Sequence, residues 1–145
     1  MIRVEVIGTG DLMQRIADFG DKQSGKVLKE VAQEVFNRAL AGAEKHTKTN
    51  ALVDSLGPGP RKIPGGYEIS HDLQRAKHGL YVHWGTRPHV IKPKEKKVLR
   101  WPSGGSFAFA KAVNHPGYKG DPWLVHAVDY VRQNFDAIAA RSTKG

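Results

Sequence analysis

The strongest constraint on the fold is an apolar stripe in the first third of the chain, between Ser24 and Ala43. Apolar residues recur there as adjacent pairs about every four positions, the pattern of a helix with one buried face. The pairs are Val27 and Leu28, Val31 and Ala32, Val35 and Phe36, and Ala39 and Leu40. Charged and amide side chains occupy most of the other positions. We therefore expect a long helix with one strip buried and the other facing water.

A second helix is predicted at the end of the chain. Asp121 is a favourable N-cap and Pro122 suits the first helical position. The apolar stripe that follows comprises Trp123, Leu124, Ala127, Val128, Val131, Phe135 and Ile138. Residues 141–145 are expected to fray into solvent. Trp123 and Leu124 are expected to seal the core.

Two shorter helical segments are also predicted. Asp11 can cap a helix that runs to Phe19, where Gly20 ends it. After the long helix, either Thr49 or Asn50 can cap a single helical turn.

The remaining regular structure is predicted to be an antiparallel sheet. Ile2–Ile7, Tyr67–His71 and Leu80–Trp84 alternate in the period of two that is typical of strands. "VLRW" and "SFAFAKAV" follow, separated by a hairpin-like break at Pro102–Gly105. The sequence thus indicates an α+β fold, with the long helix and the C-terminal helix on one face of the sheet. No repeat or boundary is visible, so 1–145 is expected to be one domain.

Two segments are predicted to be flexible loops. Residues 57–66 are too rich in glycine and proline for regular structure. His89–Lys97 holds two prolines and four lysines, so it cannot be an interior strand. Residues 87–97 are therefore expected to form an exposed basic loop or arm.

Composition limits the classes of protein. Hydrophobic residues make up 39% of the 145, and none of the apolar runs approaches the ~20 residues of a membrane span. The N-terminus does not resemble a signal peptide, so synthesis in the cytoplasm is expected. Without cysteine there is no disulfide or thiolate site. The net charge of +9 fits a nucleic-acid partner or an acidic protein surface.

Catalytic and metal sites receive little support. His83, His89 and His115 could together hold zinc, yet they show no closely spaced ligand motif. The serines lie outside a GxSxG elbow, and the glycine-rich pieces lack the phosphate-loop pattern. Those serines are Ser55, Ser70, Ser103 and Ser106. We expect no enzyme activity, no metal and no cofactor.

The basic segment leaves two alternatives open. Its residues are Arg87, His89, Lys92, Lys94, Lys96, Lys97 and Arg100, with Glu95 as the one acid among them. They could make sequence-independent phosphate contacts, with Trp84 and Trp101 stacking on bases. Alternatively, the segment is an arm that clamps a neighbouring subunit, as in rings of head-to-tail copies. The alternative to nucleic-acid contact is that both tryptophans are half-buried strand residues and the lysines lie in a solvated loop.

Three stretches resemble the HK97 gp10-like family of phage tail components, which is associated with tail completion at the head–tail junction. "TNALVDSL" is similar to the family's "TG-x-L-x-x-S-[IL]", with Asn50 in place of a common glycine. "YVHWGT", which contains Tyr81, Trp84, Gly85 and Thr86, resembles "Y-[AV]-x-[FYW]-GT", with His83 where the family often has an acid. "HPGYKGDPWLVHAV" resembles "HPGTK-x-x-P-[FW]-L-x-x-A". That last stretch contains His115, Pro116, Gly117, Pro122, Trp123 and Leu124.

The resemblance spans most of the chain, from about Gly25 to Ile138. It implies a non-enzymatic virion protein of the neck, arranged as a homo-oligomeric ring. Its neighbours would be the head connector and the tail terminator or tail tube, and contact with passing DNA would be possible. Residues Arg87, His89, Lys92, Lys94, Lys96 and Lys97 would then form a subunit-interface arm.

Overall fold

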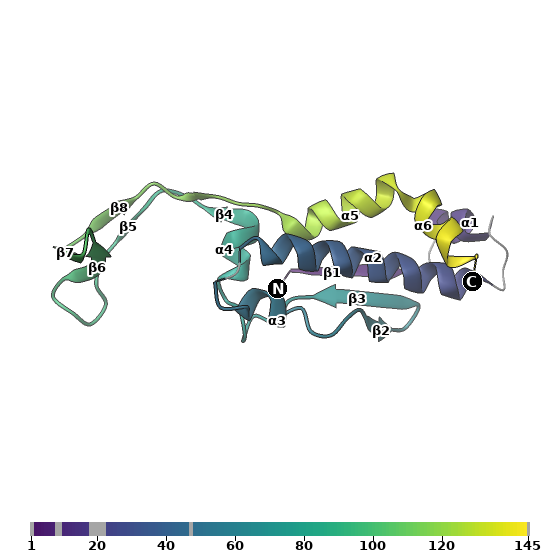
Figure 1. Ribbon diagram of the computed structural model, residues 1–145, viewed down its shortest axis with the longest axis horizontal. Helices are drawn as coiled ribbons and strands as arrows, with labels where there is room; N and C mark the ends of the chain where they lie inside the picture. Colours follow the sequence, from purple (N-terminus) through teal and green to yellow (C-terminus); the bar gives the residue numbers. More distant parts are fainter. Residues whose placement is uncertain (1, 8–9, 18–22, 47, 145) are drawn as a thin grey trace.

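The structure is a computed structural model that describes residues 2–7, 10–17, 23–46 and 48–144. Figure 1 shows two parts: a body of helices packed on a small sheet, and a long ribbon that projects from one end of the body. The fold is α+β, as the sequence predicts. No helix in the described part of the chain combines the length and apolarity needed to cross a membrane.

The sheet of the body has three antiparallel strands in the order β1 (Arg3–Ile7), β3 (Gly66–Ser70), β2 (Arg61–Ile63). Val4 pairs with Ile69, and both face the helices. The expectation of an irregular loop at 57–66 is wrong for its second half. Gly65, at φ +77°, allows the tight turn that joins β2 to β3.

Helix α2 (Ser24–Glu44) packs on this sheet and is the centre of the body. The predicted long helix is confirmed, and so is its stripe. Its buried residues are Val27, Val31, Ala32, Val35, Phe36, Ala39 and Ala43.

The C-terminal helix packs against α2, but it is divided into α5 (Trp123–Gln133) and α6 (Phe135–Ser142). Asn134 separates them, and its side-chain Nδ2 donates to the Tyr130 carbonyl at 2.8 Å. The expectation of a frayed end from residue 141 is wrong. Arg141 lies in α6 and reaches Glu30 and Glu34 on α2, at 3.2 Å each.

The predicted caps need correction. The N-cap of α5 is Pro122, so Asp121 lies one residue before the cap and uses its carboxylate elsewhere. Helix α1 (Gly10–Ala17) begins before Asp11, and Phe19, its expected end, lies outside the described residues. Helix α3 (Ala51–Asp54) has Asn50 as N-cap, yet the Asn50 side chain makes no capping hydrogen bond.

The predicted strand Leu80–Trp84 is wrong. Gly79–Trp84 forms helix α4, with the Val82 N–H bonded to the His78 carbonyl at 3.0 Å. Leu80 and Val82 pack against the core, whereas Tyr81 and Trp84 are exposed. Alternating apolar residues favoured a strand, but packing at the end of the body decides in favour of a helix.

The ribbon contains three pairs of antiparallel strands that are not joined into one sheet. They are β4 (Gly85–Thr86) with β9 (Tyr118–Lys119), β5 (His89–Ile91) with β8 (Val113–His115), and β6 (Leu99–Ser103) with β7 (Ser106–Ala110). The predicted hairpin at Pro102–Gly105 is therefore present, but it lies at the far end of the ribbon instead of in the sheet of the body. The exposed arm predicted at 87–97 is one side of this larger ribbon.

Candidate interaction surface

We call residues 85–120 the arm. Its distal part, 92–111, is the tip, and the two segments 85–91 and 112–120 are the stem. Every residue from 84 to 122 is described, and none of them is buried. The arm therefore has no core of its own. An isolated two-stranded ribbon is marginally stable in water, so a surface of this kind is typical of a segment that a partner covers.

Apolar side chains are concentrated on the arm. Seven of the eleven exposed large apolar side chains among the described residues lie there, and two more, Tyr81 and Trp84, lie on α4 at its base. The seven are Val90, Ile91, Val98, Trp101, Phe107, Phe109 and Tyr118. The candidate interaction surface is therefore the arm together with α4.

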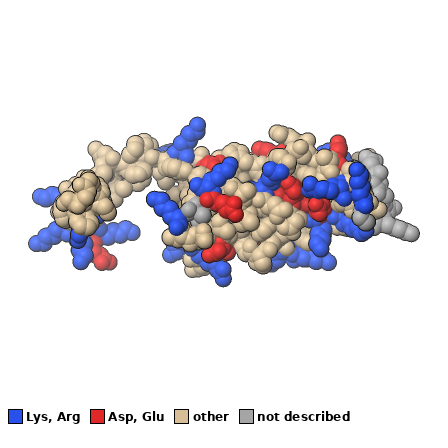
Figure 2. Space-filling model, viewed as in Figure 1, with Lys and Arg blue, Asp and Glu red and all other residues tan. Residues whose placement is uncertain are grey.

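Positive charge is concentrated on the arm as well. The arm holds eight of the 23 basic residues but one of the 14 acidic residues. It thus carries +7 of the net charge of +9 and leaves +2 for the rest of the chain. Figure 2 shows this contrast: blue side chains surround the end of the arm with little red, whereas both colours alternate over the body.

Close backbone packing holds the arm to the body. Gly85 has φ +80°, and a Cβ there would lie 2.6 Å from the Gly120 nitrogen. A Cβ at Gly120 would in turn lie 2.5 Å from the Trp84 carbonyl carbon and 2.7 Å from the His83 carbonyl oxygen. All three distances are shorter than a real Cβ tolerates. The two paired segments of the stem approach this closely because neither residue has a side chain, and we call this close approach the crossing.

Buried aromatic rings lie beneath this crossing. His83 is almost fully buried, and its ring is 4.3 Å from that of Trp84 and 5.5 Å from that of Trp123. Neither ring nitrogen has a hydrogen-bond partner among the described residues. His71 is also buried, 6.4 Å from Trp123, with Nε2 3.1 Å from the Ala76 carbonyl oxygen. Burial lowers the pKa of both histidines, so both are held neutral.

Asp121 joins the base of the arm to the helices. Its carboxylate lies 2.6 Å from Nε2 of His46, at the end of α2, and 3.1 Å from Nδ1 of His126, on α5. The hydrogen bond from His46 is the main cause that lowers the pKa of Asp121. This carboxylate therefore ties the two helices together at the point where the arm ends.

The three histidines considered as zinc ligands do not form a site. His89 and His115 are cross-strand partners on the stem, and their rings stack at 5.0 Å. Nδ1 of His89 is 2.8 Å from the Arg87 carbonyl, and Nδ1 of His115 accepts from the Gly117 N–H. His83 is buried below the arm. Across the described ranges, no group of three or more His, Cys, Asp or Glu side chains is placed to hold a metal.

The predicted interface residues are divided between stem and tip. Arg87 and His89 lie on the stem, where they help to line a hollow beside α4 with Tyr81 and Pro88. The other four, Lys92, Lys94, Lys96 and Lys97, lie on the tip, in the loop between β5 and β6.

Sequence reasoning missed the apolar part of the surface. For Trp101 the sequence left two alternatives open, stacking on bases or a half-buried strand position, and Phe107 and Phe109 were placed only in a strand of the predicted sheet. In the β6–β7 register Arg100 faces Phe109 and Pro102 faces Phe107, so both phenylalanines lie on one face. Trp101 lies on the other face. The signal in the sequence was that this hairpin carries aromatic residues on both faces and has no polar face. Such a hairpin cannot have one face on the core and the other in water.

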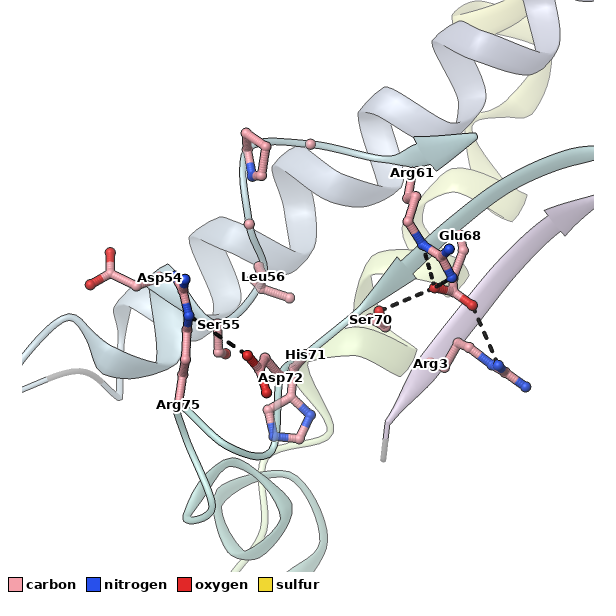
Figure 3. A pocket seen from close by; sticks show the side chains of 13 residues that line it. Arg3, Asp54, Ser55, Leu56, Arg61, Glu68, Ser70, His71, Asp72 and Arg75 are labelled. Atoms are coloured by element: carbon pink, nitrogen blue, oxygen red, sulfur yellow. Dashed lines mark hydrogen bonds and ion pairs between the residues drawn. The ribbon is translucent and has the colours of Figure 1, made fainter. Parts of the chain in front are cut away.

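A second hollow lies on the body, between the strands and the 57–60 loop (Figure 3). Its arginines already have partners: Arg3 and Arg61 bind the buried carboxylate of Glu68, and Arg75 binds Asp72. The hydrogen bond from Arg61 is the main cause that lowers the pKa of Glu68. The two pairs with Glu68 tie β1, β2 and β3 together, so the cluster of charged side chains has a structural explanation that requires no ligand.

The serines do not form a catalytic arrangement with these histidines. Ser55 donates to the Leu52 carbonyl, and Ser70 donates to Glu68 in the hollow of Figure 3. Ser103 and Ser106 pair with each other across the turn at the end of the arm.

Comparison of the chain with known protein families, with curated proteins and with solved structures finds no match.

Proposed function

We propose that this chain is a structural protein of a phage virion that acts at the head–tail junction by assembling into a ring, and that the arm makes its contacts with neighbouring proteins. The observation that carries the proposal is the arm itself. It has no buried residue, and its stem exposes Val90, Ile91 and Tyr118 next to the exposed Tyr81 and Trp84 of α4. Exposed large apolar side chains that gather on one element, unlike ones scattered singly, mark protein–protein contacts.

The stem and α4 supply the protein-binding part of this surface. Tyr81 and Trp84 on α4 lie beside the hollow that Arg87, Pro88 and His89 help to line. Large aromatic residues and arginine are the side chains that interfaces favour most. A contact here would involve an arm on one copy and a different surface on the next copy. Such heterologous contacts close into rings when the rotation between copies permits.

The motifs behind the resemblance support the proposal in a second way. "YVHWGT" and "HPGYKGDPW" are about thirty residues apart, yet they meet at the base of the arm, where Thr86 pairs with Tyr118. Asn50 stands where the family commonly has glycine. It is the one non-glycine residue with positive φ, at +57°, in the described part of the chain. Two of the three motifs thus shape the junction between body and arm, and the third shapes the start of α3.

The absence of a catalytic arrangement in the described residues is consistent with a structural role, and we propose that the chain is not an enzyme. The virion would be its location, with the connector and the tail terminator or tail tube as neighbours.

Mass spectrometry of purified phage particles that encode the chain tests this proposal. The chain is expected in intact particles, and native mass spectrometry of isolated necks should show it in a fixed copy number as a ring. Particles that are complete and infectious without the chain would contradict the proposal.

A further inference from the structure

We infer that the tip of the arm, residues 92–111, is a binding site for duplex DNA, in which the β6–β7 hairpin enters a groove and the lysine loop contacts the phosphates. This is a function in addition to the assembly role proposed above, and it uses a different part of the arm. Assembly uses the stem and α4, whereas DNA binding uses the tip.

The charge of the tip is the first observation. Six basic residues and one acid lie within these twenty positions: Lys92, Lys94, Lys96, Lys97, Arg100 and Lys111, with Glu95. All six basic residues are exposed. Among the described residues, no ion pair occupies any of them. Basic groups without acidic partners are available to replace the counterions of a phosphate backbone.

The shape of the tip is the second observation. β6 and β7 form a two-stranded antiparallel ribbon that ends in a glycine turn, with Gly104 and Gly105 both at positive φ. The major groove of B-DNA, about 12 Å wide, admits a ribbon of this kind. Ser103 and Ser106 are the residues at the end of the ribbon, so the end is narrow and polar.

The aromatic residues are the third observation. Phe107 and Phe109 lie on one face and are 48% and 62% exposed. The Arg100 guanidinium lies 3.6 Å from the centre of the Phe107 ring, so one face presents a cation and aromatic rings together. Such side chains can insert between neighbouring base steps of a duplex.

The charge of the rest of the chain argues against a second copy as the partner of the tip. Outside the arm the net charge is +2, so a neighbouring body offers no excess of negative charge to a tip of +5. Its acidic residues at the helix face, Glu30 and Glu34, are already paired with Arg141. A polyanion complements the tip, and duplex DNA combines that charge with a groove of suitable width.

The test is a fluorescence-anisotropy titration of a labelled 20-base-pair duplex with the full chain, at a series of salt concentrations from 50 to 200 mM. If all six basic groups contact phosphate, the slope of log K against log salt is expected to be about −5. The fourfold variant Lys92→Gln, Lys94→Gln, Lys96→Gln, Lys97→Gln should make this slope shallower by about 3 to 4.

A matched variant of the body separates a site from general charge. Lys26→Gln, Lys29→Gln, Lys62→Gln, Lys77→Gln removes the same charge from four exposed positions outside the arm. Its slope should stay within about 1 of the wild type. The double variant Phe107→Ala, Phe109→Ala should weaken binding about tenfold and leave the slope unchanged, because stacking contacts release no counterions.

Three results would overturn the inference. The first is no binding at 50 mM salt. The second is an equal change of slope in the tip and body variants, which would mean attraction by net charge without a site. The third is a tip variant that retains DNA binding but loses self-association in sedimentation velocity, which would make the tip a protein contact. A single-stranded 20-mer run in parallel should bind more weakly than the duplex. Tighter binding of the single strand would mean that the tip binds by stacking on unpaired bases and not by entering a groove of the duplex.

Discussion

Two tryptophans show how differently the body and the arm use the same side chain. Trp123 at the start of α5 is 1% exposed, between the two buried histidines and the end of α2. Trp101 on β6 is 39% exposed, on a ribbon without any buried residue. The body thus uses its apolar surface for its own stability, whereas the arm presents its apolar surface outward.

The body and the arm therefore depend on different interactions for their order. Among the described residues, the body has a core of twenty buried apolar side chains, which is sufficient for a cooperative fold. The arm is attached to that core through the crossing at Gly85 and Gly120, and its own strands contribute little. Changes in the body should therefore alter stability, and changes in the arm should alter binding.

The largest expected effect is at Trp123. Trp123→Ala removes a fully buried ring and should lower the free energy of unfolding by about 3 to 5 kcal/mol. Trp101→Ala, the matched change on the arm, should alter it by about 0.5 kcal/mol or less. Urea unfolding followed by circular dichroism measures both. Equal losses would mean that the arm belongs to the cooperative core.

The next effect is at the base of the arm. Gly120→Ala forces a Cβ into backbone atoms of His83 and Trp84, which should cost on the order of 1–3 kcal/mol. The loss should appear first as faster amide exchange in β4 and β9, with α2 still protected. Gly25→Ala is the control, because a Cβ there meets nothing within 4 Å. If Gly120→Ala leaves exchange at the base unchanged, the crossing is looser than we describe.

A smaller effect depends on pH. Burial lowers the pKa of His83 in the folded state, whereas in the unfolded state its pKa is about 6.5. Below about pH 6.5 the unfolded state therefore binds more protons at this residue than the folded state does. The free energy of unfolding should therefore be highest above that pH and should fall as the pH drops towards the pKa of His83 in the folded state. His71, the Asp121 carboxylate and His126 act on the same group.

Urea unfolding at pH 7.5 and 5.5 measures this loss. His83→Leu should reduce the difference between the two pH values, because the titrating group is gone while His71 remains. An unchanged difference would show that other groups account for the acid sensitivity.

Local patterns in the sequence were sufficient to predict much of the body. The apolar stripe of α2 predicts which of its residues are buried, because a helix that packs on one side repeats its apolar residues every three to four positions. The same holds for β1 and β3. The turn at Gly104–Gly105 was also predictable, since it depends on residues adjacent in the chain.

What could not be predicted depends on contacts between distant residues. Leu80–Trp84 alternates like a strand, yet packing of Leu80 and Val82 against the core makes it a helix. "SFAFA" has the composition of a core strand, but its partner is β6 and the pair projects from the body. The basic residues of the arm were identifiable from sequence. Its exposed aromatic residues were missed, because the alternation of "SFAFA" taken alone also describes a buried strand; only the hairpin as a whole, with aromatic residues on both faces, carries the signal.

The most direct test of the division into body and arm is sedimentation velocity on a chain without the outer arm. Replacing Pro88–Pro116 with a Gly-Ser dipeptide keeps the β4–β9 pair, because Gly117 lies against Thr86 and Arg87. We predict that this variant retains its unfolding free energy within about 1 kcal/mol and sediments as a monomer, whereas the full chain forms a closed oligomer. A variant that unfolds, or that assembles as the full chain does, would contradict the account.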